Sequence, residues 1–246
     1  MKAAAISEKG FRSTMEDFYF LDVDFGGKGW IYGGVYDGHG GDYTARYTAE
    51  HLHSLFLKKI LDGESPISAF NESYEEISAR LSLQDSGTTA VDFFIRNGWI
   101  YTANVGDAEA ILLTGDSYMQ LTTLHRLDNP EERKGVLLAG ATIEYPYVVR
   151  GYQGLMPTRS IGDAYFRDIG VISTPAVHEH QIGEKDFYLI AATDGLWDLM
   201  EKTEVAGFAY RFPAPEDLVD ALKHEVLVSR TGSDNLTVIA VNLQDD

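Results

Sequence analysis

The segment that decides the fold spans residues 89–122 and reads TAVDFFIRNGWIYTANVGDAEAILLTGDSYMQLT. Its β-branched and aromatic residues form four predicted strands, at 89–95, 99–105, 109–113 and 118–122. Short glycine-containing turns separate them: Asn97-Gly98, Gly106-Asp107 and Thr114-Gly115-Asp116. Connections this short permit only antiparallel pairing, because a parallel crossover needs about a dozen residues or more. The segment therefore predicts an antiparallel meander and argues against a doubly wound nucleotide-binding sheet.

Helical patterns flank this meander. From Asp42 to Ile60 apolar residues recur every three or four positions, and Asp42 is the predicted N-cap. Many antiparallel strands with helices in pairs indicate an α+β layered sandwich. No stretch has the composition of a linker, so we expect a single domain over residues 1–246. The other predicted helices cover 66–81, 130–139, 202–211 and 215–229, and the other predicted strands cover 18–23, 29–36, 142–150, 187–192 and 236–242.

Composition narrows the possible chemistry. The 246 residues contain no cysteine, which excludes a thiolate nucleophile and a disulfide framework. A formal charge of −18 disfavours nucleic-acid and anionic-membrane partners, because their phosphates would be repelled. The apolar run at residues 1–6 is too short for a signal peptide, and no later run is long enough to span a bilayer. We therefore expect a soluble, cytoplasmic protein, and we expect it to be a monomer.

Acidic residues stand beside glycine at the ends of three predicted strands. Asp37-Gly38-His39 ends the strand at 29–36, Asp194 follows the strand at 187–192, and Asp234 precedes the strand at 236–242. Mg²⁺ and Mn²⁺ prefer carboxylate and water oxygens, and two such ions about 3.5–4 Å apart typically share a carboxylate and a hydroxide. The sequence therefore predicts one hard-cation site, with Glu16 and Asp17 close to it.

Six short motifs occur in order between about residue 5 and residue 242. They are Arg12-x-x-Met15-Glu16-Asp17, Asp37-Gly38-His39-Gly40-Gly41, Val105-Gly106-Asp107-Ala108, Thr158-Arg159-Ser160-Ile161-Gly162-Asp163, Thr193-Asp194-Gly195-Leu196-Trp197-Asp198 and Asp234-Asn235-x-Thr237. This set resembles the metal-dependent serine/threonine protein phosphatases of the PP2C (PPM) family. The resemblance implies a four-layer αββα sandwich of two mainly antiparallel sheets flanked by helix pairs. It also implies a signalling hydrolase that dephosphorylates phosphoserine and phosphothreonine proteins.

The resemblance assigns a role to each matching residue. Asp37 would bridge two Mn²⁺ or Mg²⁺ ions, with the Gly38 carbonyl on one ion and Asp194 and Asp234 on the other. Glu16 and Asp17 would act mostly through metal-bound waters, Arg12 would bind the substrate phosphate, and His39 would protonate the leaving oxygen. A hydroxide shared by the ions would attack phosphorus directly, without a covalent enzyme intermediate. Asp107, Asp163 and Arg159 are expected to have structural roles.

One position departs from the family pattern. Leu124-His125 stands where the family carries Asp-His, and Arg126-Leu127 replaces the Lys-Pro that follows. The resemblance associates that aspartate with a third, weaker metal ion, which leucine cannot ligate. A third ion is therefore expected to be absent, or to be held by Asp194 with a neighbour such as Asp128. The segment 141–157 is expected to form a mobile flap beside the site.

Three other functions fit fewer of these motifs. A calcineurin-like metallophosphoesterase would explain Asp37-x-His39, but the chain contains no Asn-His pair and shows no further histidine-ligand pattern. A calcium sensor is disfavoured, because the loop that starts at Asp22-x-Asp24 has Gly33 where a bidentate glutamate belongs. A catalytically silent phosphoprotein receptor stays open, and an assay with Mn²⁺ and an aryl phosphate would separate it from an enzyme.

Overall fold

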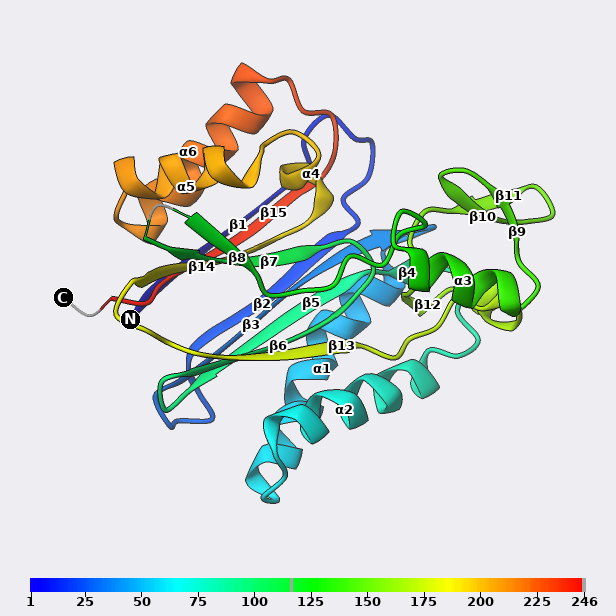
Figure 1. Cartoon of the computed structure of the whole chain (residues 1–246), viewed down its shortest axis with the longest axis horizontal. Helices are drawn as coiled ribbons and strands as arrows, with labels where there is room; N and C mark the ends of the chain where they lie inside the picture. The colour runs from blue at the N-terminus through cyan, green and yellow to red at the C-terminus, as the bar shows by residue number, and fades with distance from the viewer. Residues whose placement is uncertain (116, 245–246) are drawn as a thin grey trace.

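Two antiparallel sheets lie face to face at the centre of the molecule, and helices cover their outer faces (Figure 1). This computed structural model describes residues 1–115 and 117–244, so Asp116 of the predicted turn at 114–116 lies outside the described residues. The arrangement confirms the predicted four-layer αββα sandwich. Every strand pairing within the two sheets is antiparallel. The predicted meander is nevertheless divided between the sheets: strands 90–96 and 99–105 pair in one sheet, and strands 109–114 and 117–120 pair in the other. The Gly106-Asp107 connection therefore crosses from one sheet to the other and is not a hairpin turn.

The first sheet has the strand order β1-β15-β14-β7-β8. Its central strands β14 and β15 are apolar and almost wholly buried, because one face meets the second sheet and the other meets helices α5 and α6. These strands are β1 (Lys2–Glu8), β15 (Leu236–Asn242), β14 (Asp186–Ala192), β7 (Glu109–Thr114) and β8 (Ser117–Gln120), covered by α5 (Lys202–Arg211), α6 (Pro215–His224) and the π-helical turn Glu225–Ser229.

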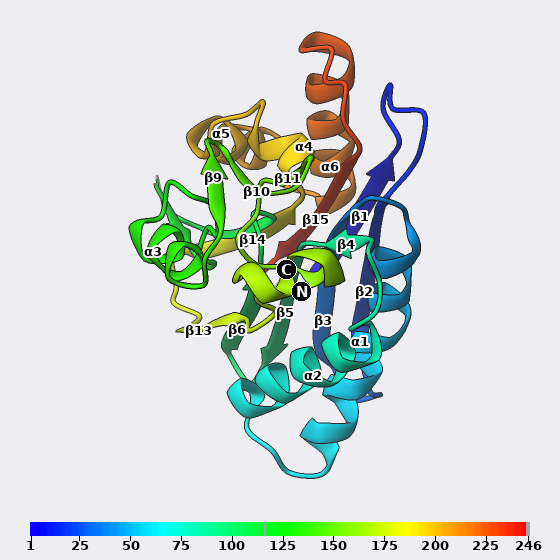
Figure 2. The same cartoon turned by 90° about the vertical axis from the view of Figure 1, so that its right-hand side faces the viewer.

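The second sheet has the strand order β12-β4-β3-β5-β6-β13, and β2 pairs with the other edge of β3. Helices α1 and α2 lie side by side across its outer face (Figure 2). Asp42 occupies the N-cap position of α1, but its side chain makes no capping hydrogen bond, whereas Ser65 caps α2. The bounds are β2 (Asp17–Phe25), β3 (Trp30–His39), β4 (Gly87–Thr88), β5 (Ala90–Arg96), β6 (Trp99–Val105), β12 (Ile161–Gly162), β13 (Ala176–Gln181), α1 (Tyr43–Leu61) and α2 (Pro66–Arg80).

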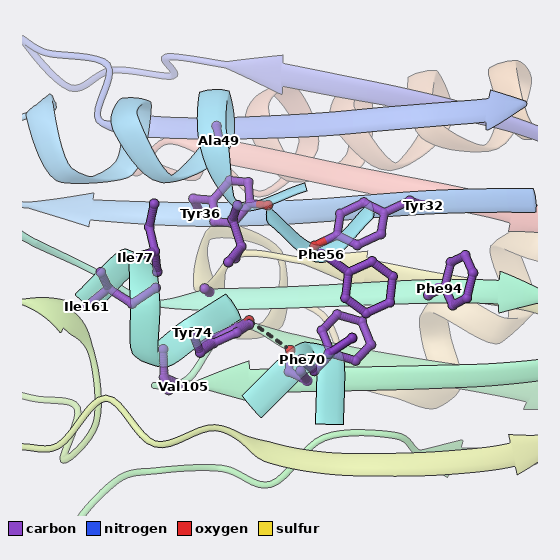
Figure 3. Close-up of a cluster of buried hydrophobic side chains, with 14 of the residues drawn as sticks. Tyr32, Tyr36, Ala49, Phe56, Phe70, Tyr74, Ile77, Phe94, Val105 and Ile161 are labelled. Carbon is purple, nitrogen blue, oxygen red and sulfur yellow. Dashed lines mark hydrogen bonds between the residues drawn. The ribbon is translucent and has the colours of Figure 1, made fainter. Parts of the chain in front are cut away.

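A buried carboxylate interrupts the apolar core between this sheet and its helices. Side chains of β5 alternate, so Val91 and Phe93 face the other sheet while Asp92 and Phe94 face the helices. Asp92 is fully buried and accepts hydrogen bonds from the hydroxyls of Tyr32 (2.8 Å), Tyr36 (2.6 Å) and Tyr74 (2.6 Å). These tyrosine rings pack among Phe56, Phe70 and Phe94 (Figure 3), so three donors satisfy the one acidic group in this core cluster.

The segment after α3 (Pro130–Leu138) corrects one prediction. Residues 142–150 were predicted as one strand but form β9 (Thr142–Glu144) and β10 (Tyr147–Arg150), because Pro146 at the turn between them has no amide hydrogen for a ladder. With β11 (Gln153–Leu155) they make a small separate sheet over a fourth apolar cluster. Several elements were not predicted: strands β1, β4, β11, β12 and β13, the 3₁₀ helix Ala164–Ile169 and the short helix α4 (Asp194–Trp197).

None of the helices within residues 1–115 and 117–244 combines the length and the apolar character needed to cross a membrane.

Candidate active site

A cavity of about 720 Å³ opens at the edge of the sandwich where the two sheets meet α4 and the small sheet. Residues from distant parts of the chain line it, and nearly all the residues predicted for the site are among them. Asp17 is the exception, because it is buried beneath the cavity wall and accepts a 2.9 Å hydrogen bond from the Thr193 hydroxyl. The predicted residues that line the cavity are Arg12, Glu16, Asp37, Gly38, His39, Asp194 and Asp234.

The β2–β3 pairing places Asp37. Asp17 at the start of β2 is the partner of Asp37 near the end of β3, so the two carboxylates lie on neighbouring strands. The next residue, Gly38, donates its amide to the Glu16 carbonyl at 3.1 Å. A Cβ atom on residue 38 would lie 2.4 Å from that same carbonyl oxygen, so only glycine allows the strands to approach this closely.

The β14–β15 pairing places Asp194 and Asp234. Because these strands are antiparallel neighbours, the segment that follows β14 and the segment that precedes β15 meet at the same end of the sheet. Asp194 begins α4 there, and Gly195 permits the close approach, since a Cβ atom on it would lie 1.9 Å from the Asn235 carbonyl oxygen. Asp234, Asp194 and Asp37 therefore reach the same cavity from three different segments.

Asn235 anchors the loop that carries Arg12 and Glu16. Its side-chain amide donates to the carbonyls of Lys9 (2.8 Å) and Thr14 (3.0 Å), and its Oδ1 accepts from the Glu16 amide at 2.8 Å. The motif contains this residue, but its partners could not be predicted from the sequence, because they are more than 200 positions away. Asn235 therefore holds the loop with Arg12, the predicted phosphate-binding residue, beside the carboxylates of the cavity.

The carboxyl groups of the cavity destabilise one another's charged forms. Burial, followed by repulsion from Asp17 and Asp194, raises the pKa of Asp37 well above its usual value. Burial and the neighbouring acids likewise raise the pKa of Asp17 to about 7, and burial, with repulsion from Asp107 and Asp198, raises the pKa of Asp194 to about 6. A bound cation would remove this repulsion, so the site is suited electrostatically to positive charge.

The donor set fits hard divalent ions that keep part of their water shell. Carboxylate and carbonyl oxygens are the ligands that Mg²⁺ and Mn²⁺ prefer. Among the described residues no three acidic or histidine side chains form a complete ligand set around one point. Mg²⁺ is usually bound by only one or two carboxylates and several waters, so the separated aspartates match that kind of coordination.

Two charged pairs occupy the cavity wall. The Arg12 Nη2 donates to Oδ2 of Asp234 at 2.6 Å, and both side chains are exposed to solvent. His39 Nε2 lies 2.8 Å from Oδ2 of Asp163, which is buried and adopts a left-handed backbone conformation. Burial lowers the pKa of His39, but the hydrogen bond and charge of Asp163 outweigh it, so the pKa is raised above its usual value.

Two acidic residues of the cavity that were expected to be structural accept hydrogen bonds from basic side chains. Asp163 accepts from His39, and Asp107 accepts a 2.6 Å hydrogen bond from Arg126 Nε. Arg159 matches its expected structural role, because its guanidinium binds Glu132 and the Thr174 carbonyl. Residues Gln153 to Pro157 of the predicted flap form another part of the cavity wall.

This fold and this acidic cavity belong to one known class of hydrolase. The family model of protein phosphatase 2C matches residues 1–233, and the chain belongs to that family. The chain is 31% identical over its whole length to the probable protein phosphatase 2C member 13, mitochondrial, of Oryza sativa, of which it covers 69%. It is 32% identical to the probable protein phosphatase 2C 59 of Arabidopsis thaliana, with 98% of this chain and 79% of the relative covered.

Solved structures share the fold. A serine-threonine phosphatase 2C from Toxoplasma gondii superimposes with a TM-score of 0.85 at 20% identity, over 98% of this chain and 94% of that one. A C. elegans sex determining protein superimposes with a TM-score of 0.87 at 21% identity, over 99% of this chain and 65% of that one. The protein is therefore a phosphatase-family hydrolase with the four-layer fold that the sequence predicts.

Proposed function

We propose that this protein hydrolyses phosphoserine and phosphothreonine in proteins, using two Mn²⁺ or Mg²⁺ ions and no covalent enzyme intermediate. One observation carries the proposal. Asp37, Asp194 and Asp234 come from three separate segments and line a single cavity, where burial and mutual repulsion raise the pKa values of Asp37 and Asp194. Such an arrangement favours cations that neutralise it, and family membership supports a phosphoester substrate.

Each side chain has one role in this proposal. Asp37 and the Gly38 carbonyl, with Asp194 and Asp234, would hold the ions directly, and Glu16 and Asp17 would do so through water. When bound, the ions supply a deprotonated water near neutral pH and neutralise the phosphoryl oxygens. A third ion is not part of the proposal, because Leu124 offers no donor atom.

The chain's own groups position the phosphate and protonate the product. Arg12 lies at the cavity wall with an exposed guanidinium, whose planar fork can bind two phosphate oxygens. His39 uses Nε2 to bind Asp163, which leaves Nδ1–H to donate to the departing seryl or threonyl oxygen. Because the attack comes from water, no side chain needs to become phosphorylated.

We also propose that residues 1–246 form one phosphatase domain. We propose a monomer that works in signalling without nucleic-acid or membrane partners. The cytoplasmic location stays a prediction, and the name of the rice relative places that protein in mitochondria.

An assay with purified protein and a panel of phosphoserine and phosphothreonine peptides tests the proposal. We expect turnover with Mn²⁺ or Mg²⁺, loss of turnover with a chelator, and recovery when the ion is returned. Asp37→Asn should abolish turnover, while Asp62→Asn, an exposed acidic residue after α1, serves as the matched control. A protein that binds phosphopeptides with these ions but never hydrolyses them would instead be the receptor.

A further inference from the structure

Arg126 places a guanidinium among three carboxylates at the edge of the cavity. Its Nε donates to Oδ2 of Asp107 at 2.6 Å, its Nη2 lies 3.5 Å from Oδ2 of Asp194, and its Nη1 lies 3.7 Å from Oδ1 of Asp198. Asp107 and Asp194 both line the cavity. One fixed positive charge thus lies against one of the proposed metal ligands and against two acids to which the mechanism gives no role.

The surrounding structure holds this guanidinium in place. The Arg126 side chain is only 21% exposed and that of Asp107 only 5% exposed, so their ion pair is shielded from water. The Arg126 backbone forms a β-bridge with Pro157, and the next residue, Leu127, is buried in the apolar cluster under the small sheet. Asp194 begins α4 and Asp198 is its C-cap, one turn later, where the Asp198 amide donates to the Asp194 carbonyl.

A positive charge at the position of the Arg126 guanidinium stabilises Asp107, Asp194 and Asp198. Like charges this close repel, and the Arg126 guanidinium lies within 3.7 Å of all three carboxylates. A guanidinium is always charged and has five donors in a planar fork, so it can face several carboxylates together. Without it, the carboxylates of Asp107, Asp194 and Asp198 would lose their shared counter-charge, and carboxylate oxygens are ligands that hard divalent ions prefer.

We propose that the Arg126 guanidinium takes the place of a divalent cation next to the two-ion site, so that this protein binds two ions and not three. Arg126 is then a positioning residue: it neutralises Asp107 and Asp198 and holds the Asp194 carboxylate toward the ions. This inference rests on the proposed function, since it assumes that Asp194 is a metal ligand. It also gives a physical reason why Leu124, without a donor atom, is compatible with an active site.

The number of Mn²⁺ ions bound, measured by equilibrium dialysis and titration calorimetry without substrate, tests the inference. We expect two ions for the wild type and for Arg126→Lys, which keeps the positive charge. We expect three for Arg126→Met, because Asp107, Asp194 and Asp198 then lack their cation. The double variant Arg126→Met/Asp198→Asn should return to two ions. Arg230→Met is the matched control, because it frees Glu204 and Glu225 outside the cavity and should leave the count at two.

Other ion counts would contradict either this inference or the proposed function. Three ions in the wild type, which requires no variant to fold, would overturn the inference while leaving the proposed function intact. Two ions in a folded Arg126→Met protein would also overturn it, since the three acids would then not form a cation site. No ion in the wild type would refute the proposed function itself, and the inference would fall with it.

Discussion

His39 Nε2 lies 2.8 Å from Oδ2 of Asp163, a residue 124 positions later in the chain. The carboxylate fixes the ring orientation and raises the pKa of His39 against the opposing effect of burial. A histidine that is held and kept protonated in this way is well prepared to donate a proton to a leaving oxygen. The pair therefore links the fold to the proposed acid step.

Replacement of His39 should affect substrates according to their leaving groups. We expect His39→Ala to lower kcat for a phosphoserine peptide by about 10²- to 10⁴-fold, and to have a much smaller effect on an aryl phosphate, whose leaving group needs little protonation. Asp163→Asn should lower the ratio of peptide turnover to aryl phosphate turnover by a smaller factor than His39→Ala does. Asparagine tolerates the left-handed backbone at this position, so the loop that carries it should keep its conformation. Steady-state kinetics on both substrates measure the effect.

A second histidine–aspartate pair provides the control for this experiment. His180 Nε2 lies 2.8 Å from Oδ2 of Asp186, and neither residue lines the cavity. His180→Ala should leave the ratio of the two activities unchanged. If His39→Ala lowered both activities equally, His39 would not act as the acid.

Mn²⁺ should stabilise the folded protein through Asp37. A ligand that binds only the folded state adds about 2.7 kcal/mol at a concentration 100 times its Kd. For a chain of this size we expect a rise in Tm of about 5–10 °C, at about 2–4 °C per kcal/mol. Asp37→Asn should lose most of this rise, and without metal it should melt no lower than the wild type, because it removes a buried charge from an acidic cluster. Differential scanning calorimetry with Mn²⁺ and with EDTA measures both effects.

Arg12 should contribute to phosphate binding and not to metal binding. Hydrogen bonds to charged groups contribute about 1.5–3 kcal/mol, so Arg12→Ala should lower kcat/KM for phosphopeptides about 10- to 100-fold and weaken inhibition by inorganic phosphate. The substitution also frees Asp234 from its ion pair, so Mn²⁺ affinity should stay the same or increase. Arg80→Ala, which breaks an ion pair with Glu76 on α2, is the control. Weaker Mn²⁺ binding in Arg12→Ala would contradict this assignment.

The buried carboxylate of Asp92 should make folding stability depend on pH. Burial, opposed by hydrogen bonds from three tyrosines, raises the pKa of Asp92 from 3.8 to about 6. The folded state therefore binds the proton more tightly, and the stabilisation that this gives is complete below about pH 4 and disappears as the pH rises through 6. Between pH 5 and 7.5 the free energy of unfolding of the wild type, relative to Asp92→Asn, should fall by on the order of 1 kcal/mol. Urea denaturation at both pH values measures this difference, and a constant difference would show that Asp92 does not titrate in this range.

The sequence predicted the layers because short turns and periodic apolar residues are local signals. The four strands at 89–122 and the helices over 42–60 and 66–81 are present, with ends that differ by a few residues. The four strands do not form one meander, because the chain passes to the other sheet between 99–105 and 109–114, and a short turn alone does not reveal such a crossing. The break between β9 and β10 was not predicted, although Pro146 indicates it. The prediction followed the apolar residues on both sides of the proline as one strand. Strand β1 was missed for another reason: its short apolar run, KAAAISE, becomes a strand through pairing with β15, more than 200 residues away.

The candidate site also combines features that the sequence predicted with features that it could not predict. Motif order indicated that Asp37, Asp194 and Asp234 would meet, and they do line one cavity, although their role as ligands stays a prediction. The contacts of Asp163 with His39 and of Arg126 with Asp107 could not be predicted. Both depend on how loops from separate elements lie against each other, and no spacing along the chain records that.

The tyrosine-bound aspartate in the core also constrains how this chain can change over evolutionary time. Losing Asp92 alone would remove the acceptor that three phenolic hydroxyls share, and losing one tyrosine would leave a carboxylate with fewer donors. Gly34 adds a further restriction, since any side chain there would start 2.3 Å from the Asp92 oxygen. Descendants and close homologues should therefore keep or exchange these positions together, and epistasis among positions 32, 34, 36, 74 and 92 should appear in any library that randomises them.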